Sequence, residues 1–168
     1  YTQTGEAVAT LWARHKIEAL EDGFEVVENR KPEDYTGIDD MAAESPVINM
    51  VNSIIQRAVR DKASDIHIET TGEGVIIKYR VDGVLYQATE TIDGRFQSPI
   101  ISRIKVMSEL DISERRIPQD GRFKVRLGGK SIDFRVSIMP TVFGEDAVVR
   151  ILDKESIAAD MKGLTLEA

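Results

Sequence analysis

The chain has 168 residues, of which 42% are hydrophobic and 30% charged, a composition typical of a globular domain. It contains no cysteine, which excludes disulfides and thiolate metal sites, and no apolar run approaches the roughly 18 residues that a membrane-spanning helix needs. The net charge of −7 arises in residues 1–46, with eleven acidic and four basic residues, while residues 47–168 hold eighteen of each, a balance that argues against a general nucleic-acid-binding domain.

Residues 1–44 are expected to form an extension ahead of the main domain. Apolar residues recur near helical spacing over 5–20, which predicts a short amphipathic helix, and Phe24–Val27 either add one strand or continue that helix. His15 has no accompanying cluster of histidines or carboxylates, so we interpret it as a packed or solvated side chain. Residues 28–44 are acidic and show no period, which predicts a linker.

A core helix is predicted to begin at Ser45-Pro46. A hydroxyl cap is followed there by proline at the first helical position, where the missing N–H costs nothing. An apolar stripe then recurs at helical spacing. Its members are Val47, Met50, Val51, Ile54, Ile55, Ala58 and Val59.

The next segment, Ser64–Glu69, alternates as a strand does. Its isoleucines point inward, which puts Asp65, His67 and Glu69 together on the other face. Imidazole and carboxylates suit a metal such as zinc, but three ligands in a row on one flat strand face surround an ion poorly. We therefore favour a contact with a neighbouring domain or partner, or structural hydrogen bonds, over a metal site.

Two further strands and a second helix follow. Val75–Val81 and Val84–Glu90 are separated by Asp82-Gly83, a strong signal for a tight hairpin. Helical spacing then relates a second apolar set, made of Phe96, Ile100, Ile101, Ile104 and Met107. Residues 110–117 are expected to cross over to a second hairpin.

The second hairpin is the most regular stretch of the chain. Arg122–Leu127 and Ser131–Ile138 alternate strictly, and Gly128-Gly129 between them can adopt the positive φ angles of a primed turn. One face is predicted to be apolar and the other cationic. A turn at Gly144-Glu145-Asp146 and a last strand, Ala147–Leu152, are expected to complete the domain.

The order helix, linker, helix, three strands, helix, three strands predicts an α+β fold, with an antiparallel sheet covered on one face by two helices. Gly129-Lys130-Ser131 copies the end of a phosphate-binding loop, but Lys124 stands where the first glycine is required and strands flank the motif on both sides. The segment is therefore interpreted as a hairpin turn, and no complete active site is found.

Four blocks, in order and at family spacing, resemble the second N-terminal domain of the hexameric ATPases of type II secretion and type IV pilus assembly. The blocks are Ala63–Glu69, Tyr79–Leu85, Arg116–Arg122, and Arg135–Pro140 followed by Gly144-Glu145 and Val149–Asp153. The resemblance implies a PAS-like fold for residues 45–153. Residues 1–27 would be the tail end of the first N-terminal domain, 28–44 the acidic linker, and 154–168 the start of the connection to a C-terminal ATPase domain.

In this family, ATP and Mg²⁺ bind on that C-terminal RecA-like domain, and the second N-terminal domain closes over the nucleotide. The two phosphate-contacting arginines of the family map onto Arg135 and Arg150, while Arg80, Arg116 and Arg122 are expected to contact other domains or subunits. The residues alone favour an ion pair of Arg135 with Asp133 or Asp120 and a surface position for Arg150 on an edge strand, and it is the resemblance that favours phosphate contact. The chain by itself is expected to hold neither ATP nor Mg²⁺.

The partners that the resemblance implies are the C-terminal ATPase domain of the same chain, neighbouring subunits of a homo-hexamer, and inner-membrane platform proteins. Nucleic acid and membrane insertion are not expected, and the location would be the cytoplasm, at the bacterial inner membrane. Two rival functions remain open. One is an interaction module that docks an acidic partner on the cationic hairpin; the other, a single-strand nucleic-acid binder, is disfavoured because Phe123 and Phe134 point into the apolar face.

Overall fold

The computed structural model describes residues 20–21, 23–27 and 46–153. The helix predicted over 5–20 and the linker predicted over 28–44 therefore lie outside the described residues, as does the segment after residue 153. Within the described part, the elements follow one another along the chain in a fixed order. They are β1 Glu25–Val27, α3 Pro46–Arg60, β2 Asp65–Thr70, β3 Val75–Val81, β4 Val84–Gln87, the 3-10 turn η2 Gly94–Phe96, α4 Gln97–Met107, β5 Gln119–Leu127, β6 Lys130–Thr141 and β7 Gly144–Leu152.

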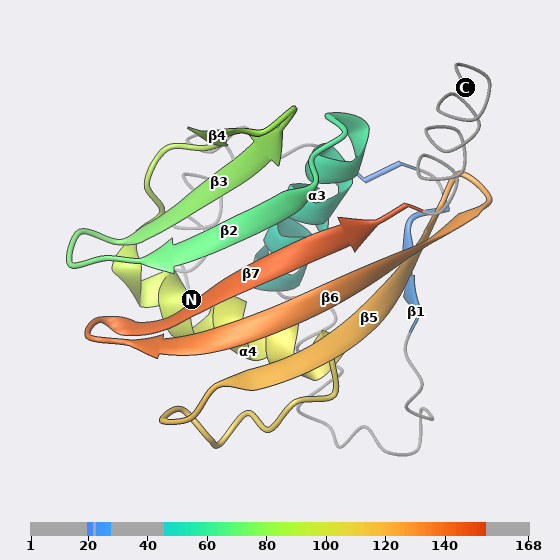
Figure 1. Ribbon diagram of the computed structural model, residues 1–168. Helices are drawn as coiled ribbons and strands as arrows, with labels where there is room; N and C mark the ends of the chain where they lie inside the picture. The colour runs from blue at the N-terminus through green and yellow to red at the C-terminus, as the bar shows by residue number, and fades with distance from the viewer. Residues whose placement is uncertain (1–19, 22, 28–45, 154–168) are drawn as a thin grey trace, which may run out of the picture.

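The seven described strands form one antiparallel sheet in the order β1-β5-β6-β7-β2-β3-β4. Helices α3 and α4 both lie behind this sheet, and no helix of the described residues covers its front face (Figure 1). The predicted α+β class and the placement of both helices on one face are thus confirmed. The uncovered side is called the open face below.

Both predicted tight turns are present. Asp82 and Gly83 have φ angles of 52° and 81°, and Gly128 and Gly129 have φ angles of 60° and 81°. Positive φ at both central residues matches the right-handed twist of the flanking strands, which is why these dipeptides close hairpins. In the second hairpin the register pairs Phe123 with Phe134, and their rings stack with centroids 4.7 Å apart.

Three details of the prediction are wrong. β4 ends at Gln87 instead of Glu90, because the chain bends back there and Ile92 forms a bridge with Val75. β7 begins at Gly144, where a turn was expected, because the β6–β7 turn is made by Val142-Phe143 between the paired residues Thr141 and Gly144. β7 is also a central strand between β6 and β2, so Arg150 does not lie on a sheet edge.

β1 adds a short edge strand next to β5, with Val26 opposite Val125. This confirms the strand alternative for residues 24–27. These residues lie within the segment expected to be the tail end of a preceding domain, yet they extend the same sheet as residues 119–152.

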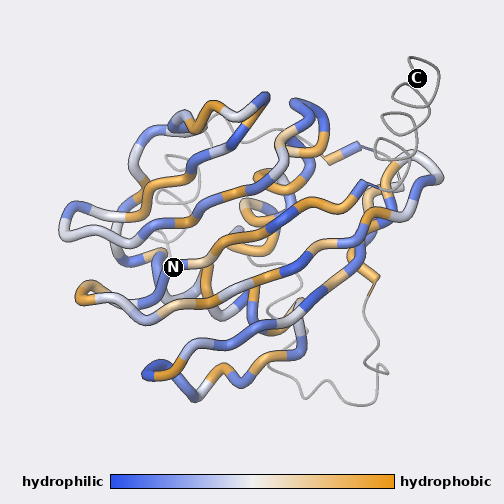
Figure 2. The backbone as a smooth tube through the Cα atoms, viewed as in Figure 1, coloured by the Kyte–Doolittle hydropathy of each residue, from blue (hydrophilic) through white to orange (hydrophobic). Residues whose placement is uncertain are grey.

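The core lies between the sheet and the two helices. Helix α3 buries its predicted apolar stripe, including Met50, Ile54 and Ala58, and Tyr79 on β3 donates a hydrogen bond of 2.6 Å to the carbonyl of Ile54. Asn52, which is not a member of the predicted stripe, is buried as well. Hydrophobic and hydrophilic stretches alternate along the strands in Figure 2, as expected for a sheet with one covered face. No helix of the described residues is long and apolar enough to span a membrane.

A buried ion pair joins α4 to the start of β7. The Lys105 Nζ lies 2.7 Å from Glu145 Oε2, and it also donates a hydrogen bond of 2.7 Å to the carbonyl of Glu114. The side chain of Lys105 is only 1% exposed. These two contacts hold α4, β7 and the connection that leads from α4 to β5 against one another.

Candidate functional site

One line of charged residues crosses the open face from β5 to β3. The register places Arg122 opposite Arg135, Arg135 opposite Arg150, Arg150 opposite Asp65, and Asp65 opposite Arg80. Directly opposed residues on neighbouring antiparallel strands project from the same face, with Cβ atoms about 4.5–5.5 Å apart. These five residues are called the arginine row below.

Three members of the arginine row lack a described partner. The side chains of Arg122, Arg135 and Arg150 are exposed, and within the described residues none of the three has a hydrogen bond or ion pair. The ion pair of Arg135 with Asp133 or Asp120, which the residues alone favoured, is thus not formed between described residues. Asp133 is paired with Lys124, whose Nζ lies 3.7 Å from its Oδ1.

Arg80 has a different environment. Its Nε lies 3.5 Å from Asp65 Oδ2, and its Nη1 donates a hydrogen bond of 3.1 Å to the carbonyl of Gly83 in the β3–β4 turn. Arg116 lies outside the row, on the connection between α4 and β5, where its side chain is 91% exposed and its Nε is 3.7 Å from Glu114 Oε1. The structure therefore brings together four of the five arginines singled out in the sequence and leaves Arg116 apart.

Asp65 is the acidic member of the row, and its two oxygens have several partners. Ser64 Oγ donates to Oδ1 at 2.8 Å, and His67 Nε2 lies 2.5 Å from Oδ2. Burial acts to raise the pKa of the Asp65 carboxyl, but the hydrogen bonds from Ser64 and His67 and the charges of His67 and Arg80 outweigh it and lower the pKa below its ordinary 3.8. Asp65 is thus ionised at neutral pH.

The triplet considered as a metal site is engaged in other contacts. His67 contacts Asp65, and Glu69 Oε2 lies 2.9 Å from Lys78 Nζ on β3. Among the described residues there is no group of three or more histidines and carboxylates placed to hold a metal ion. These contacts match the interpretation that the triplet supplies structural hydrogen bonds.

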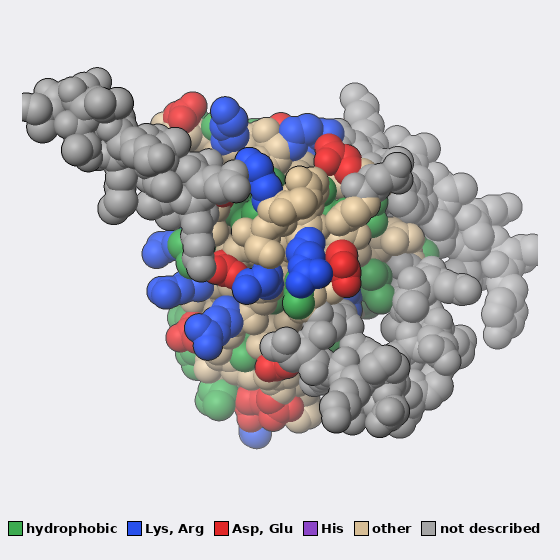
Figure 3. Space-filling view, turned by 90° about the vertical axis from the view of Figure 1, so that its right-hand side faces the viewer, with side chains coloured by type: hydrophobic (Ala, Val, Ile, Leu, Met, Phe, Trp, Pro, Cys, Tyr) green, Lys and Arg blue, Asp and Glu red, His purple; other side chains and the backbone are tan. Residues whose placement is uncertain are grey.

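Positive charge gathers along the open face. Figure 3 views the molecule from the right-hand side of Figure 1, so the open face lies on the left of that view, where Lys and Arg side chains cluster. In the arginine row itself four guanidinium groups accompany one carboxylate. A guanidinium fork matches the oxygens of a phosphate or carboxylate with two parallel hydrogen bonds, so this face is suited to an anion with several oxygens.

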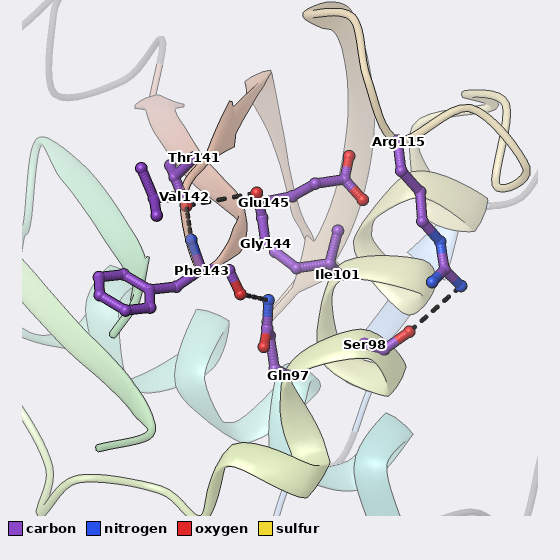
Figure 4. A pocket seen from close by; sticks show the side chains of 9 residues that line it. All are labelled: Gln97, Ser98, Ile101, Arg115, Thr141, Val142, Phe143, Gly144 and Glu145. Carbon is purple, nitrogen blue, oxygen red and sulfur yellow. Dashed lines mark hydrogen bonds between the residues drawn. The ribbon is translucent and has the colours of Figure 1, made fainter. Parts of the chain in front are cut away.

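A separate pocket of about 350 Å³ lies between α4 and the β6–β7 hairpin and is lined by Gln97, Ser98, Ile101, Arg115, Thr141, Val142, Phe143, Gly144 and Glu145 (Figure 4). Gln97 Nε2 donates to the carbonyl of Phe143 at 3.1 Å, and Arg115 Nη2 donates to Ser98 Oγ at 3.4 Å. None of the arginines of the row lines this pocket. Its polar groups join the hairpin to the helix, and we assign it a packing role.

Sequence reasoning missed that Asp65 lies in line with the arginines. The β2–β7 pairing that puts Asp65 opposite Arg150 joins residues 85 positions apart, and no local pattern signals it. The place of Arg122 beside Arg135 could be foreseen, because Gly128-Gly129 sets the register of that hairpin.

Comparison with known proteins identifies similar sequences for the same region of the chain. The family described as "Type II/IV secretion system protein" matches residues 40–168. The chain is 44% identical over 140 residues to the type IV pilus assembly ATPase PilB of Myxococcus xanthus, a match that covers 81% of this chain and 25% of the relative. It is 48% identical over 128 residues to the type II secretion system protein E of Xanthomonas campestris, covering 76% of this chain and 22% of that protein.

A third relative, the type II secretion system ATPase E of Vibrio cholerae, is 43% identical over 125 residues, which is 74% of this chain and 25% of the relative. The chain thus spans about a quarter of the length of the curated relatives that it matches. The segment that matches the family, residues 40–168, includes the arginine row, whose residues run from 65 to 150.

Proposed function

The chain belongs to the type II/IV secretion system protein family, and from this membership we propose that it is the second N-terminal domain of a secretion or pilus-assembly ATPase. In this proposal the domain has no catalysis of its own. It closes over ATP and Mg²⁺ bound to a RecA-like C-terminal domain and gives Arg135 and Arg150 to the phosphates. Hydrolysis would thereby be coupled to protein secretion or pilus extension. Its relatives in Myxococcus xanthus and Vibrio cholerae are ATPases of pilus assembly and of type II secretion, which supports this assignment.

The observation that carries the proposal is the register pair Arg135–Arg150 on the open face. Two exposed arginines lie directly opposite each other there without a described partner, and like charges in that arrangement destabilise a sheet. A bound polyanion removes the repulsion. During phosphoryl transfer negative charge develops on the phosphate oxygens, and an arginine placed there contributes on the order of 10³ to 10⁵ in rate.

The described residues are better suited to complete a nucleotide site formed by another domain than to bind a nucleotide by themselves. A nucleotide triphosphate is usually held by a glycine-rich loop at a helix N-terminus, whose backbone N–H groups surround the phosphates. The described dipeptides Asp82-Gly83 and Gly128-Gly129, which have positive φ, close hairpins between strands instead. We therefore assign the phosphate loop and the Mg²⁺ ligands to the C-terminal domain. The closing movement would also bring neighbouring subunits of a homo-hexamer into contact. In the same proposal, the ATPase lies in the cytoplasm and has inner-membrane platform proteins as partners.

A second candidate function uses the same face. Lys124 and Arg126 extend the positive charge of the open face along β5 beyond the arginine row, which favours docking of an acidic partner protein. In that case the arginines would contact carboxylates of the partner and never a nucleotide. The two functions differ in what the loss of one arginine does to ATP turnover.

The test uses the full-length protein with Arg135→Ala or Arg150→Ala. We expect ATP turnover to fall at least about tenfold in each, because a transition-state contact is lost. Lysine at either position should restore little, since an ammonium cannot make the two parallel hydrogen bonds of the fork. The melting temperature of the 168-residue chain should not fall in either alanine variant, because neither arginine has a described partner.

Arg126→Ala is the matched control, because Arg126 is an arginine of β5 on the same open face, four residues from Arg122 along the strand. Its turnover should stay at the wild-type value. Unchanged turnover in both Arg135→Ala and Arg150→Ala would remove the phosphate-contact proposal and leave the docking function as the better account.

A further inference from the structure

We propose that Arg122 is a third phosphate-contacting arginine, and that the row Arg122, Arg135 and Arg150 distinguishes a nucleoside triphosphate from a diphosphate. This inference rests on the proposed function and extends it, because Arg122 was expected from the sequence to contact another domain or subunit. The register on the open face is the observation that changes its assignment.

The first step is geometric. Arg122 lies directly opposite Arg135, which lies directly opposite Arg150, so three guanidinium groups extend from three adjacent strands in one line. Neighbouring strands are about 4.8 Å apart. Side chains as long as arginine can therefore converge from adjacent strands on one group of phosphates.

Arg122 also stands on a well-defined backbone. β5 and β6 are paired continuously from Gln119–Ile138 to Leu127–Lys130, so a register slip would break the whole hairpin. The preceding residue, Gly121, lies so close to the α4–β5 connection that a Cβ atom there would come within 2.9 Å of the carbonyl oxygen of Ser108. The backbone that carries Arg122 is thus held on both sides.

The second step concerns charge. Other cations of the open face have an acid nearby: Lys78 pairs with Glu69 and Lys124 with Asp133. Arg80 pairs with Asp65, and Arg126 lies opposite Glu25 in the register. Arg122 and Arg135 have only arginines opposite them among their register partners. Arg150 has Arg135 on one side and Asp65 on the other, but the described contacts of Asp65 are with Ser64, His67 and Arg80. The fold thus compensates positive charge over most of this face and leaves it concentrated at one place.

The third step is the chemistry of the ligand. Three like charges side by side repel one another, and a polyanion relieves this repulsion in proportion to its own charge. A triphosphate carries one more phosphate group than a diphosphate and offers more oxygens to planar forks. The row should therefore favour the triphosphate, and Arg122 should matter mainly when the terminal phosphate is present.

The experiment is calorimetry on the full-length protein, with a non-hydrolysable ATP analogue and with ADP, both with Mg²⁺. We expect Arg122→Ala to lose about tenfold or more in affinity for the analogue, the size of one charge-assisted hydrogen bond, and much less for ADP. Arg126→Ala, on the same strand and face, should bind both nucleotides as the wild-type protein does. Arg122→Lys, which keeps the charge and the side-chain stem, should recover the affinity for the analogue only in part.

Each other outcome overturns a definite statement. If Arg122→Ala binds the analogue like Arg126→Ala while Arg135→Ala and Arg150→Ala lose affinity, Arg122 is no phosphate contact and the proposed function stands. Equal losses for analogue and ADP would remove the discrimination between them. If the three arginine variants all bind as the wild-type protein does, the proposed function fails and this inference with it. If Arg122→Ala unfolds at a lower temperature, its affinity cannot be compared directly, and Arg122→Lys is used in its place. Wild-type affinity of Arg122→Lys for the analogue would then contradict the proposed phosphate contact.

Discussion

At the scale of single residues, Asp65 has the most contacts within the arginine row. Its carboxylate accepts a hydrogen bond from Ser64, contacts His67 Nε2, and lies 3.5 Å from Arg80 Nε. One acidic side chain therefore orders three neighbours. Asp65 also lies opposite Arg150 in the register, yet its described contacts are with these other groups. Arg80 is therefore held by Asp65, whereas Arg150 keeps its guanidinium available.

The lowered pKa of Asp65 leads to a prediction about pH. A carboxyl whose pKa is lower in the folded chain than in the unfolded chain stabilises the fold above its ordinary pKa of 3.8, and this stabilisation is lost as the pH falls through the folded value. Asp65→Asn should therefore lower the free energy of unfolding of the chain at pH 7 by about 1.5–3 kcal/mol, the range for hydrogen bonds to charged groups.

Urea unfolding at a series of pH values checks this prediction. The difference between wild type and Asp65→Asn should be present at pH 5 and should shrink as the pH falls below 3.8. Glu73→Gln, on the exposed β2–β3 turn, is the control and should leave the curve unchanged. A difference that persists undiminished in acid would show that the Asp65 charge is not what stabilises the fold.

At the scale of elements, the position of α4 depends on the buried contact between Lys105 and Glu145. Burying these two charges costs desolvation free energy, and their mutual attraction offsets this cost only because each charge lies next to the other. The additional hydrogen bond from Lys105 to the carbonyl of Glu114 fixes the connection that leads into β5. The start of the strand that carries Arg122 is thus tied to the helix layer.

We expect Lys105→Met to lower the free energy of unfolding by about 3 kcal/mol or more, because it leaves Glu145 charged, buried and without its ammonium partner. The double variant Lys105→Met with Glu145→Gln should regain part of this loss, since the second change removes the buried charge. Chemical denaturation of the two single variants and the double variant measures the coupling. Additive losses would contradict a direct interaction between the two side chains.

At the scale of the whole molecule, the sheet has a protected centre and two weaker edges. β6, β7 and β2 are paired on both sides, whereas β1 and β4 are edge strands of three and four residues. Exposed apolar side chains, Val84 and Tyr86, belong to the β4 edge. The arginine row runs from β5 through the centre to β3, so all five of its members stand on strands that have a neighbour on each side.

Hydrogen exchange should reflect this arrangement. Amides of β6, β7 and β2 are expected to exchange most slowly, because they open only with global unfolding, and those of β1 and β4 should exchange faster through local opening. Exchange measured by mass spectrometry on the 168-residue chain tests the order. Slower exchange in β4 than in β7 would contradict the strand order that brings Arg150 to the centre.

Local patterns in the sequence were enough to predict much of the fold. The dipeptides Asp82-Gly83 and Gly128-Gly129 specify tight turns, and the apolar periods specify the two helices and the inward face of each strand. Arg122 and Arg135 could be placed side by side for the same reason, since one turn connects their strands. The boundaries of β4 and β7 were wrong because they depend on where Ile92 and Thr141 find partners across the sheet.

The sequence by itself thus determined the α+β class, the two hairpins, and the cationic face of the second hairpin, because a period of two and a tight turn act over a few neighbouring residues. Only the tertiary structure decided that β7 pairs with β2, that Asp65 enters the arginine row, and that Lys105 meets Glu145. These contacts join distant parts of the chain, and they form because the packing of the whole sheet against α3 and α4 outweighs the entropy of closing such long loops.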